Sequence, residues 1–175
     1  MDDKIGKTAI DVRELKHSED LLKVEDIIVE EFKAIDVIGF RFTSCPMTQS
    51  SVTPRTYLYT DKYNPTKEEL DQQEKEIRKK YATERALSMF TTDSKAEKQA
   101  NRLVKKMDED EAEAFMEENA YIVKFVIPSS AGVVNTPHKN TGHFNYLPGQ
   151  DIDVLSLMDE TYGYKKIDYG NGSDK

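Results

Sequence analysis

Three short polar segments carry the side chains best suited to chemistry, and each lies at or just after a predicted β-strand. They are 40–43 (Phe-Arg-Phe-Thr), 90–94 (Phe-Thr-Thr-Asp-Ser) and 148–153 (Pro-Gly-Gln-Asp-Ile-Asp). The first offers a guanidinium, which binds phosphate oxygens in bidentate fashion. The second offers hydroxyls beside a predicted helix N-terminus, a place that attracts anions. The third offers two carboxylates, which stabilise a developing positive charge.

The first two segments also have ordinary structural interpretations, which the sequence leaves open. Arg41 could form a salt bridge on an exposed sheet face. Thr91 and Thr92 are typical strand residues. Ser94, with Glu97 three residues later, fits a helix capping box.

The carboxylate segment has two interpretations as well. Asp151 and Asp153 alternate around Ile152, so on an incoming strand both would point to the same face. One carboxylate could then stabilise positive charge while the other orients the attacking nucleophile. The alternative is a solvated turn after Pro148 and Gly149.

Hydrophobic periodicity predicts the elements that must position these side chains, with strong helices in the first two-thirds and strands dominating the end. This segregation favours an α+β fold over alternating βαβ units. A polar loop is expected over 44–52, and another over 135–149. Helices are predicted from 18, with Ser18 as the N-cap, to before 36, over 66–82, begun by a capping box of Thr66 and Glu69, and over 94–107 and 112–118, where the acidic residues 108–111 interrupt them. Strands are predicted over 37–42, 56–60, 87–92, 121–127, 131–134, 154–158 and 162–169.

Composition sets the outer limits. A chain of 175 residues favours one domain, predicted over 1–170, with a Gly- and Asp-rich tail over 171–175 expected to be disordered. Hydrophobic residues make up 37% and charged residues 33%, which indicates a modest core and solvated helices. The net charge of -8 argues against general nucleic-acid binding, although one local basic group can still hold a nucleotide.

Cysteine and histidine usage argues against a metal centre. The single cysteine, Cys45, excludes an intramolecular disulfide and a multi-cysteine zinc site, and it is interpreted as a small core thiol, with a nucleophile after the Arg41 strand as the alternative. His138 and His143 lie five residues apart in a predicted loop, which is not a known ligand spacing. No signal peptide or membrane span is expected, so the chain is predicted to be cytoplasmic.

Taken together, the three segments resemble the ADP-ribosyltransferase superfamily with its Arg, Ser-Thr-Ser and Glu-x-Glu motifs. Arg41 occupies the position of the family's first-strand arginine, and 91–94 that of the Ser-Thr-Ser strand. The strand 121–127, followed by a proline, is similar to the family's strand before the carboxylate motif. Segment 148–155 resembles Pro-Gly-Glu-x-Glu-Val-Leu, with aspartates in place of both glutamates, and 162–167 looks like the last hairpin strand of phage enzymes that modify host proteins.

The resemblance implies N-terminal helices packed on a mainly antiparallel, split sheet, and NAD as the substrate. Arg41 would clamp NAD, while the hydroxyls of Thr91, Thr92 and Ser94 would hold its nicotinamide-ribose region. Asp153 would stabilise the transition state of transfer to a host protein, and Asp151 would align the acceptor.

The aspartates depart from the family pattern. Each is shorter than glutamate by one methylene, which would move the carboxylate by about 1 Å and cost on the order of a hundredfold in rate. Asp93 is a second departure, since it is inserted in the hydroxyl motif.

Two other functions fit the same sequence. One is a non-catalytic acidic protein, phage-encoded in one version, that inhibits or modulates a host protein through the charged helix 65–81 and the acidic stretch 108–118. The other is a nuclease or hydrolase that uses Asp151, Asp153 and His143. Convergence of Arg41, Thr92 and Asp153 on one cleft would favour NAD, whereas a position on separate faces would count against it.

Overall fold

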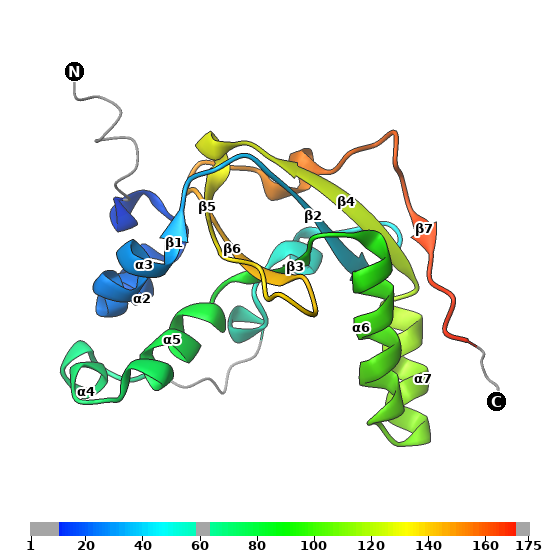
Figure 1. Cartoon of the computed structure of the whole chain (residues 1–175), viewed down its shortest axis with the longest axis horizontal. Coiled ribbons are helices and arrows are strands. Elements are labelled where there is room, and N and C mark those ends of the chain that lie inside the picture. Colours follow the sequence, from blue (N-terminus) through cyan, green and yellow to red (C-terminus); the bar gives the residue numbers. More distant parts are fainter. Residues whose placement is uncertain (1–10, 59–63, 171–175) are drawn as a thin grey trace.

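The computed structural model describes residues 11–58 and 64–170, and it confirms the α+β class. Within these residues, seven strands form one antiparallel sheet in the order β1-β5-β6-β3-β2-β4-β7 (Figure 1). The predicted tail, 171–175, lies outside the described residues. The strands are β1 (Phe32–Lys33), β2 (Val37–Thr43), β3 (Leu87–Phe90), β4 (Tyr121–Ile127), β5 (Gly132–Asn135), β6 (His143–Pro148) and β7 (Lys165–Lys166).

The sheet is split into two halves that meet at a single residue pair. β2 pairs with β4 along its whole length, but with β3 only through Phe40 and Phe90. β3 continues the other half through β6, β5 and β1. Beyond Phe40, β2 and β3 therefore part, with Arg41 on one strand and Ser88 on the other.

The N-terminal helices pack against the β1-β5-β6 end of the sheet, as predicted. They are α2 (Ser18–Leu21), the 3-10 turn η2 (Leu22–Val24) and α3 (Glu25–Glu31), and they contact α4 (Lys67–Asp71) and α5 (Lys75–Thr83). A further 3-10 turn, η1 (Val12–Glu14), precedes them. Their shared core contains Leu21, Val24, Ile27, Ile28, Leu70, Tyr81 and Ala82, with Val133 and Leu147 from the sheet.

A second helical pair lies on the β2-β4 half. α6 (Asp93–Lys105) and α7 (Glu109–Glu118) lie side by side and extend away from the sheet (Figure 1). Ala96 and Ala100 pack on Phe90 and Ile122, because small residues let the α6 backbone approach the strands closely. The acidic stretch predicted to interrupt the helices instead begins α7, where Asp108 and Glu111 form a capping box.

Two short 3-10 helices, η3 (Gln49–Val52) and η6 (Val154–Leu157), pack on the opposite face of the sheet. η4 (Arg55–Tyr57) instead contacts the N-terminal helices through the Tyr57–Asp20 hydrogen bond, and η5 (Ser129–Ala131) links β4 to β5. Val52 and Val154 are buried among Met89, Val123 and Phe125. Burial of these valines holds two irregular segments against the sheet.

Several predicted elements are wrong. Over the described part of 56–60 the chain forms the end of η4 and a turn, not a strand. The predicted loop over 135–149 contains β6, whose residues are nearly all buried between β3 and β5, so they show no alternation of apolar and polar residues. The last two predicted strands do not pair with each other. The first of them is the 3-10 helix η6, and the second contains only the two-residue strand β7, which pairs with β4.

Helix boundaries also differ from the prediction. The predicted helix 66–82 is two helices, α4 and α5, although its Thr66–Glu69 capping box is confirmed. The first helix begins at Ser18, but His17 is its N-cap and makes no side-chain cap.

Candidate functional site

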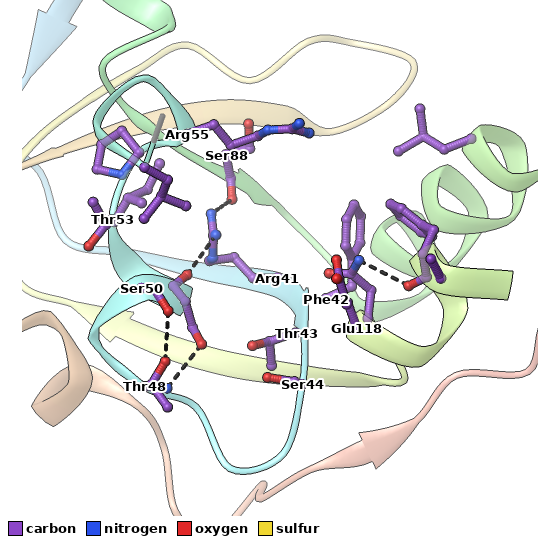
Figure 2. A pocket seen from close by; sticks show the side chains of 18 of the residues that line it. Arg41, Phe42, Thr43, Ser44, Thr48, Ser50, Thr53, Arg55, Ser88 and Glu118 are labelled. Carbon is purple, nitrogen blue, oxygen red and sulfur yellow. Dashed lines mark hydrogen bonds between the residues drawn. The ribbon is translucent and has the colours of Figure 1, made fainter. Parts of the chain in front are cut away.

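An open cleft of about 780 Å³ lies where β2 and β3 part. Figure 2 shows Arg41 in this gap, with Ser88 on one side and the hydroxyl-rich segment around Ser50 on another. α6 and α7 form the far wall through Leu103, Met107, Phe115 and Glu118. The hydroxyls that line the cleft belong to Thr43, Ser44, Thr48, Ser50, Ser51, Thr53 and Ser88.

Arg41 bridges the two sides of the cleft with its guanidinium. Nη1 donates to the carbonyl oxygen of Ser88 at 2.7 Å, and Nη2 donates to the carbonyl oxygen of Ser51 at 2.9 Å. Because β2 and β3 share only one ladder pair, the bond to Ser88 connects the two strands where the ladder does not, and the bond to Ser51 connects β2 to η3. The predicted salt bridge on an exposed sheet face is not seen among the described residues.

The electrostatics of Arg41 distinguish it from an ordinary surface arginine. The residue as a whole is part-buried, but its Nε is shielded from solvent and has no hydrogen-bond partner in the described part of the chain. Burial lowers the pKa of Arg41 to about 10, and no carboxylate of the described residues offsets that effect. A desolvated cation without a counter-ion is costly, so an anionic ligand group at this position would be stabilising.

Ser88 and His143 form a second polar contact at the cleft. Ser88 Oγ lies 3.0 Å from Nε2 of His143 on the neighbouring strand. Burial, and to a lesser extent the charge of His138, lower the pKa of His143, so its ring is neutral at pH 7. Neither Ser88 nor the lining segment 48–53 was predicted, since the only signal in the sequence was the polarity of the loop.

The predicted hydroxyl group of the NAD site does not line the cleft. Thr92 is the N-cap of α6 and accepts a hydrogen bond from the backbone N–H of Lys95 at 3.1 Å. The predicted capping box is therefore wrong, because Ser94 lies inside the first turn, while Glu97 accepts from the backbone of Asp168. Thr91 donates its backbone N–H to the carbonyl of Gly142.

Asp93, the inserted residue of the hydroxyl motif, has a clear structural role. Its carboxylate accepts a hydrogen bond from Tyr162 Oη at 3.0 Å and pairs with Lys165 Nζ at 3.4 Å. Burial alone would raise the pKa of Asp93, but these two partners outweigh it and hold the pKa below its usual value. Asp93 thus connects the start of α6 to the C-terminal segment.

Asp151 and Asp153 follow a strand, as predicted, but do not lie on one. Both are exposed, Asp151 in a turn and Asp153 just before η6, so the predicted shared strand face is wrong. The backbone carbonyl of Asp153 accepts from Ser156, whereas its side chain makes no capping bond.

The carboxylate segment lies beside a second, smaller cavity. This cavity, of about 220 Å³, is lined by Ile152 and Val154 together with Lys16 and His17. Segment 53–54 lines both cavities, so the chain around η3 separates the two aspartates from the Arg41 cleft. Of the residues predicted for the NAD site, only Arg41 lines the cleft, so the convergence of Arg41, Thr92 and Asp153 that would favour NAD is not seen.

Comparison with protein-family models, curated proteins and solved structures gave no match. In residues 11–58 and 64–170, no helix combines the length and the apolar character needed to cross a membrane.

Proposed function

We propose that this protein binds NAD in the cleft beside Arg41, as an ADP-ribosyltransferase-like protein whose site is arranged for binding rather than for transfer. The observation that carries the proposal is the Arg41 guanidinium at the cleft, whose Nε is shielded from solvent without a hydrogen-bond partner and which has no carboxylate partner among the described residues. A pyrophosphate would supply the missing negative charge and accept from the guanidinium.

The rest of the cleft is compatible with a nucleotide. Its hydroxyl-bearing wall offers hydrogen-bond donors to phosphate and ribose oxygens, and Arg55 adds a second guanidinium to the lining. Phe42, Phe90 and Phe115 give the other side an apolar, aromatic character that suits a base or nicotinamide ring. A volume of about 780 Å³ lies within the range of cofactor sites.

Transfer has less support than binding. Stabilising the transition state needs a carboxylate next to the nicotinamide ribose, but Asp151 and Asp153 do not line the cleft. Asp153 would take that role only if the chain around η3 moved. In the arrangement described, the protein holds NAD without a carboxylate from the predicted motif.

Isothermal titration calorimetry tests the proposal with NAD, ADP-ribose and nicotinamide as separate ligands. We expect NAD and ADP-ribose to bind and nicotinamide to bind far more weakly, because the pyrophosphate provides the contact with Arg41. Arg41→Lys keeps the charge but loses the planar fork, so it should weaken NAD binding by about tenfold or more. Arg55→Gln should weaken binding as well.

Arg13→Gln is the matched control, since Arg13 is exposed, pairs with Asp11 and lies outside the cleft. It should leave NAD affinity unchanged, and thermal unfolding of each variant checks that the fold is intact. The proposal would be refuted if the wild type bound neither NAD nor ADP-ribose. It would also be refuted if Arg41→Lys and Arg55→Gln bound NAD with the affinity of the wild type.

Labelled NAD and host lysate distinguish binding from transfer. We expect no label on protein. Label that depends on Asp153, and is lost in Asp153→Asn, would instead establish transfer to a host protein and require the segment around η3 to move.

A further inference from the structure

The solvent-facing side of α6 is a continuous basic surface. Its cations follow one another at intervals of i, i+3, i+7, i+10 and i+11, which places them on one side of the helix, opposite the apolar residues that face the sheet. We call this set the basic stripe: Lys95, Lys98, Arg102, Lys105 and Lys106.

α7 has a surface of the opposite sign. Its exposed carboxylates at intervals of i, i+1, i+4 and i+8 also share one side of the helix. We call this set the acidic stripe: Glu109, Asp110, Glu113 and Glu117.

Neither stripe is neutralised by another charged group of residues 11–58 and 64–170, although the two helices pack side by side. No ion pair among the described residues involves a member of either stripe, and Arg102 donates only to the amide oxygen of Gln99, at 2.7 Å. The other charged helix pair is different. α5 is connected to α3 by the pairs Lys75–Glu30, Arg78–Asp26 and Lys79–Glu31.

We propose that the α6–α7 pair is a self-association surface, on which the basic stripe of one copy faces the acidic stripe of a second copy of this chain. A two-fold arrangement would satisfy both stripes at once, because each copy presents both signs. Nucleic acid is a poorer occupant of the basic stripe, since the protein carries a net charge of -8 and would be repelled. This inference is independent of the NAD proposal.

The expected association is electrostatic, so it should be weak and sensitive to salt. Exposed ion pairs each contribute little, and salt screens them. We therefore expect dimers at low ionic strength that dissociate as the salt concentration rises to about 0.5 M, where the screening length falls to a few ångströms.

Sedimentation velocity of the full chain, over a range of protein and salt concentrations, tests the proposal with two charge-reversed variants. The first carries Lys98→Glu, Arg102→Glu and Lys105→Glu, so both of its stripes are acidic. The second carries Glu109→Lys, Glu113→Lys and Glu117→Lys, so both are basic. Each variant alone should be monomeric at low salt, whereas an equimolar mixture should associate again, because every facing pair of stripes then has opposite signs.

A third variant, with Lys33→Glu, Lys139→Glu and Lys166→Glu, is the matched control. It changes the net charge as much as the first variant, but at exposed positions outside α6, and it should associate like the wild type. Circular dichroism confirms that each variant is folded.

Three outcomes would overturn the proposal. They are a wild type that is monomeric under all conditions, a mixture of folded variants that stays monomeric, and a wild type that binds a labelled oligonucleotide through α6 but does not self-associate.

Discussion

Two arginines of this protein, the buried Arg85 and the part-buried Arg41, have partners of different kinds. Arg85 is 1% exposed and faces a carboxylate, with its Nε 3.4 Å from Asp20 and its guanidinium 3.6 Å above the ring of Tyr81. Arg41 donates only to backbone carbonyls, at Ser88 and Ser51. A carbonyl carries no net charge, so Arg41 is the arginine able to recruit an anionic ligand.

Removing the carboxylate that faces Arg85 should be strongly destabilising. Asp20→Ala would also take away the acceptor of the Tyr57 hydroxyl, which lies 2.6 Å from Asp20. We expect the free energy of unfolding to fall by about 3 kcal/mol, as when one partner of a buried pair is removed. Urea denaturation measures the loss, and Asp71→Ala, which removes an exposed ion pair, should cost less than about 1 kcal/mol. A small loss for Asp20→Ala would contradict this account.

The stability of the protein should fall on mild acidification because the fold lowers the pKa of two histidines, the part-buried His143 and the exposed His17, whose ring stacks on Tyr57. Burial lowers the pKa of His143 and of His17 below the ordinary value of 6.5. The unfolded chain therefore binds more protons than the folded one just below pH 6.5, and the free energy of unfolding decreases as the pH falls from there toward the lowered pKa values.

His143→Gln should reduce this pH dependence. The variant removes one of the two histidines whose lowered pKa makes them bind protons preferentially in the unfolded state. Urea midpoints measured from about pH 7.5 to about pH 5 should fall less steeply than those of the wild type. Equal slopes for both proteins would show that His143 does not contribute.

At the scale of elements, the junction between β3 and α6 shows how a polar motif can serve structure. Thr92 caps the helix, and Asp93 binds Tyr162 and Lys165 of the C-terminal segment. The hydroxyl of Thr92 and the carboxylate of Asp93 thus have structural roles without a ligand.

Substitution at this junction separates the structural role from nucleotide binding. Thr92→Ala should lower the free energy of unfolding by about 1 kcal/mol, because the backbone N–H of Lys95 loses its acceptor. Thr92→Ser should restore stability, and Ser94→Ala should change it little. Calorimetry should show unchanged NAD affinity in all three variants. A loss of NAD affinity in Thr92→Ala alone would place Thr92 in the binding site.

At the scale of the whole molecule, the split sheet decides where the cleft lies. The halves meet at Phe40 and Phe90, next to Gly39. A Cβ at Gly39 would lie 3.0 Å from the side chains of both Met89 and Phe144, which belong to the other half. The close approach of the two halves therefore depends on this glycine.

Gly39→Ala should weaken the joint between the halves. The added methyl group would push on two fully buried side chains, and overpacking of this kind costs about 1–3 kcal/mol. Thermal unfolding measures the effect, with Ile38→Ala as a nearby exposed control that should change stability less. An unchanged unfolding temperature for Gly39→Ala would mean that the halves can shift to accept the methyl group.

The sequence by itself determined the features that depend on neighbouring residues. Local patterns predicted β2 and β4 and the Thr66 capping box, because a strand preference or a cap involves side chains a few positions apart. Helix charge patterns are local in the same way, so the stripes of α6 and α7 follow from spacing alone.

The tertiary structure decided which of these features meet. β6 is a strand because β3 and β5 lie on either side of it, and Arg41 finds its acceptors 10 and 47 residues away. The aspartates that the sequence grouped with Arg41 are separated from it by the chain around η3, which is held by the burial of Val52. Packing over the whole chain fixes such distances, and a local pattern contains no information about them.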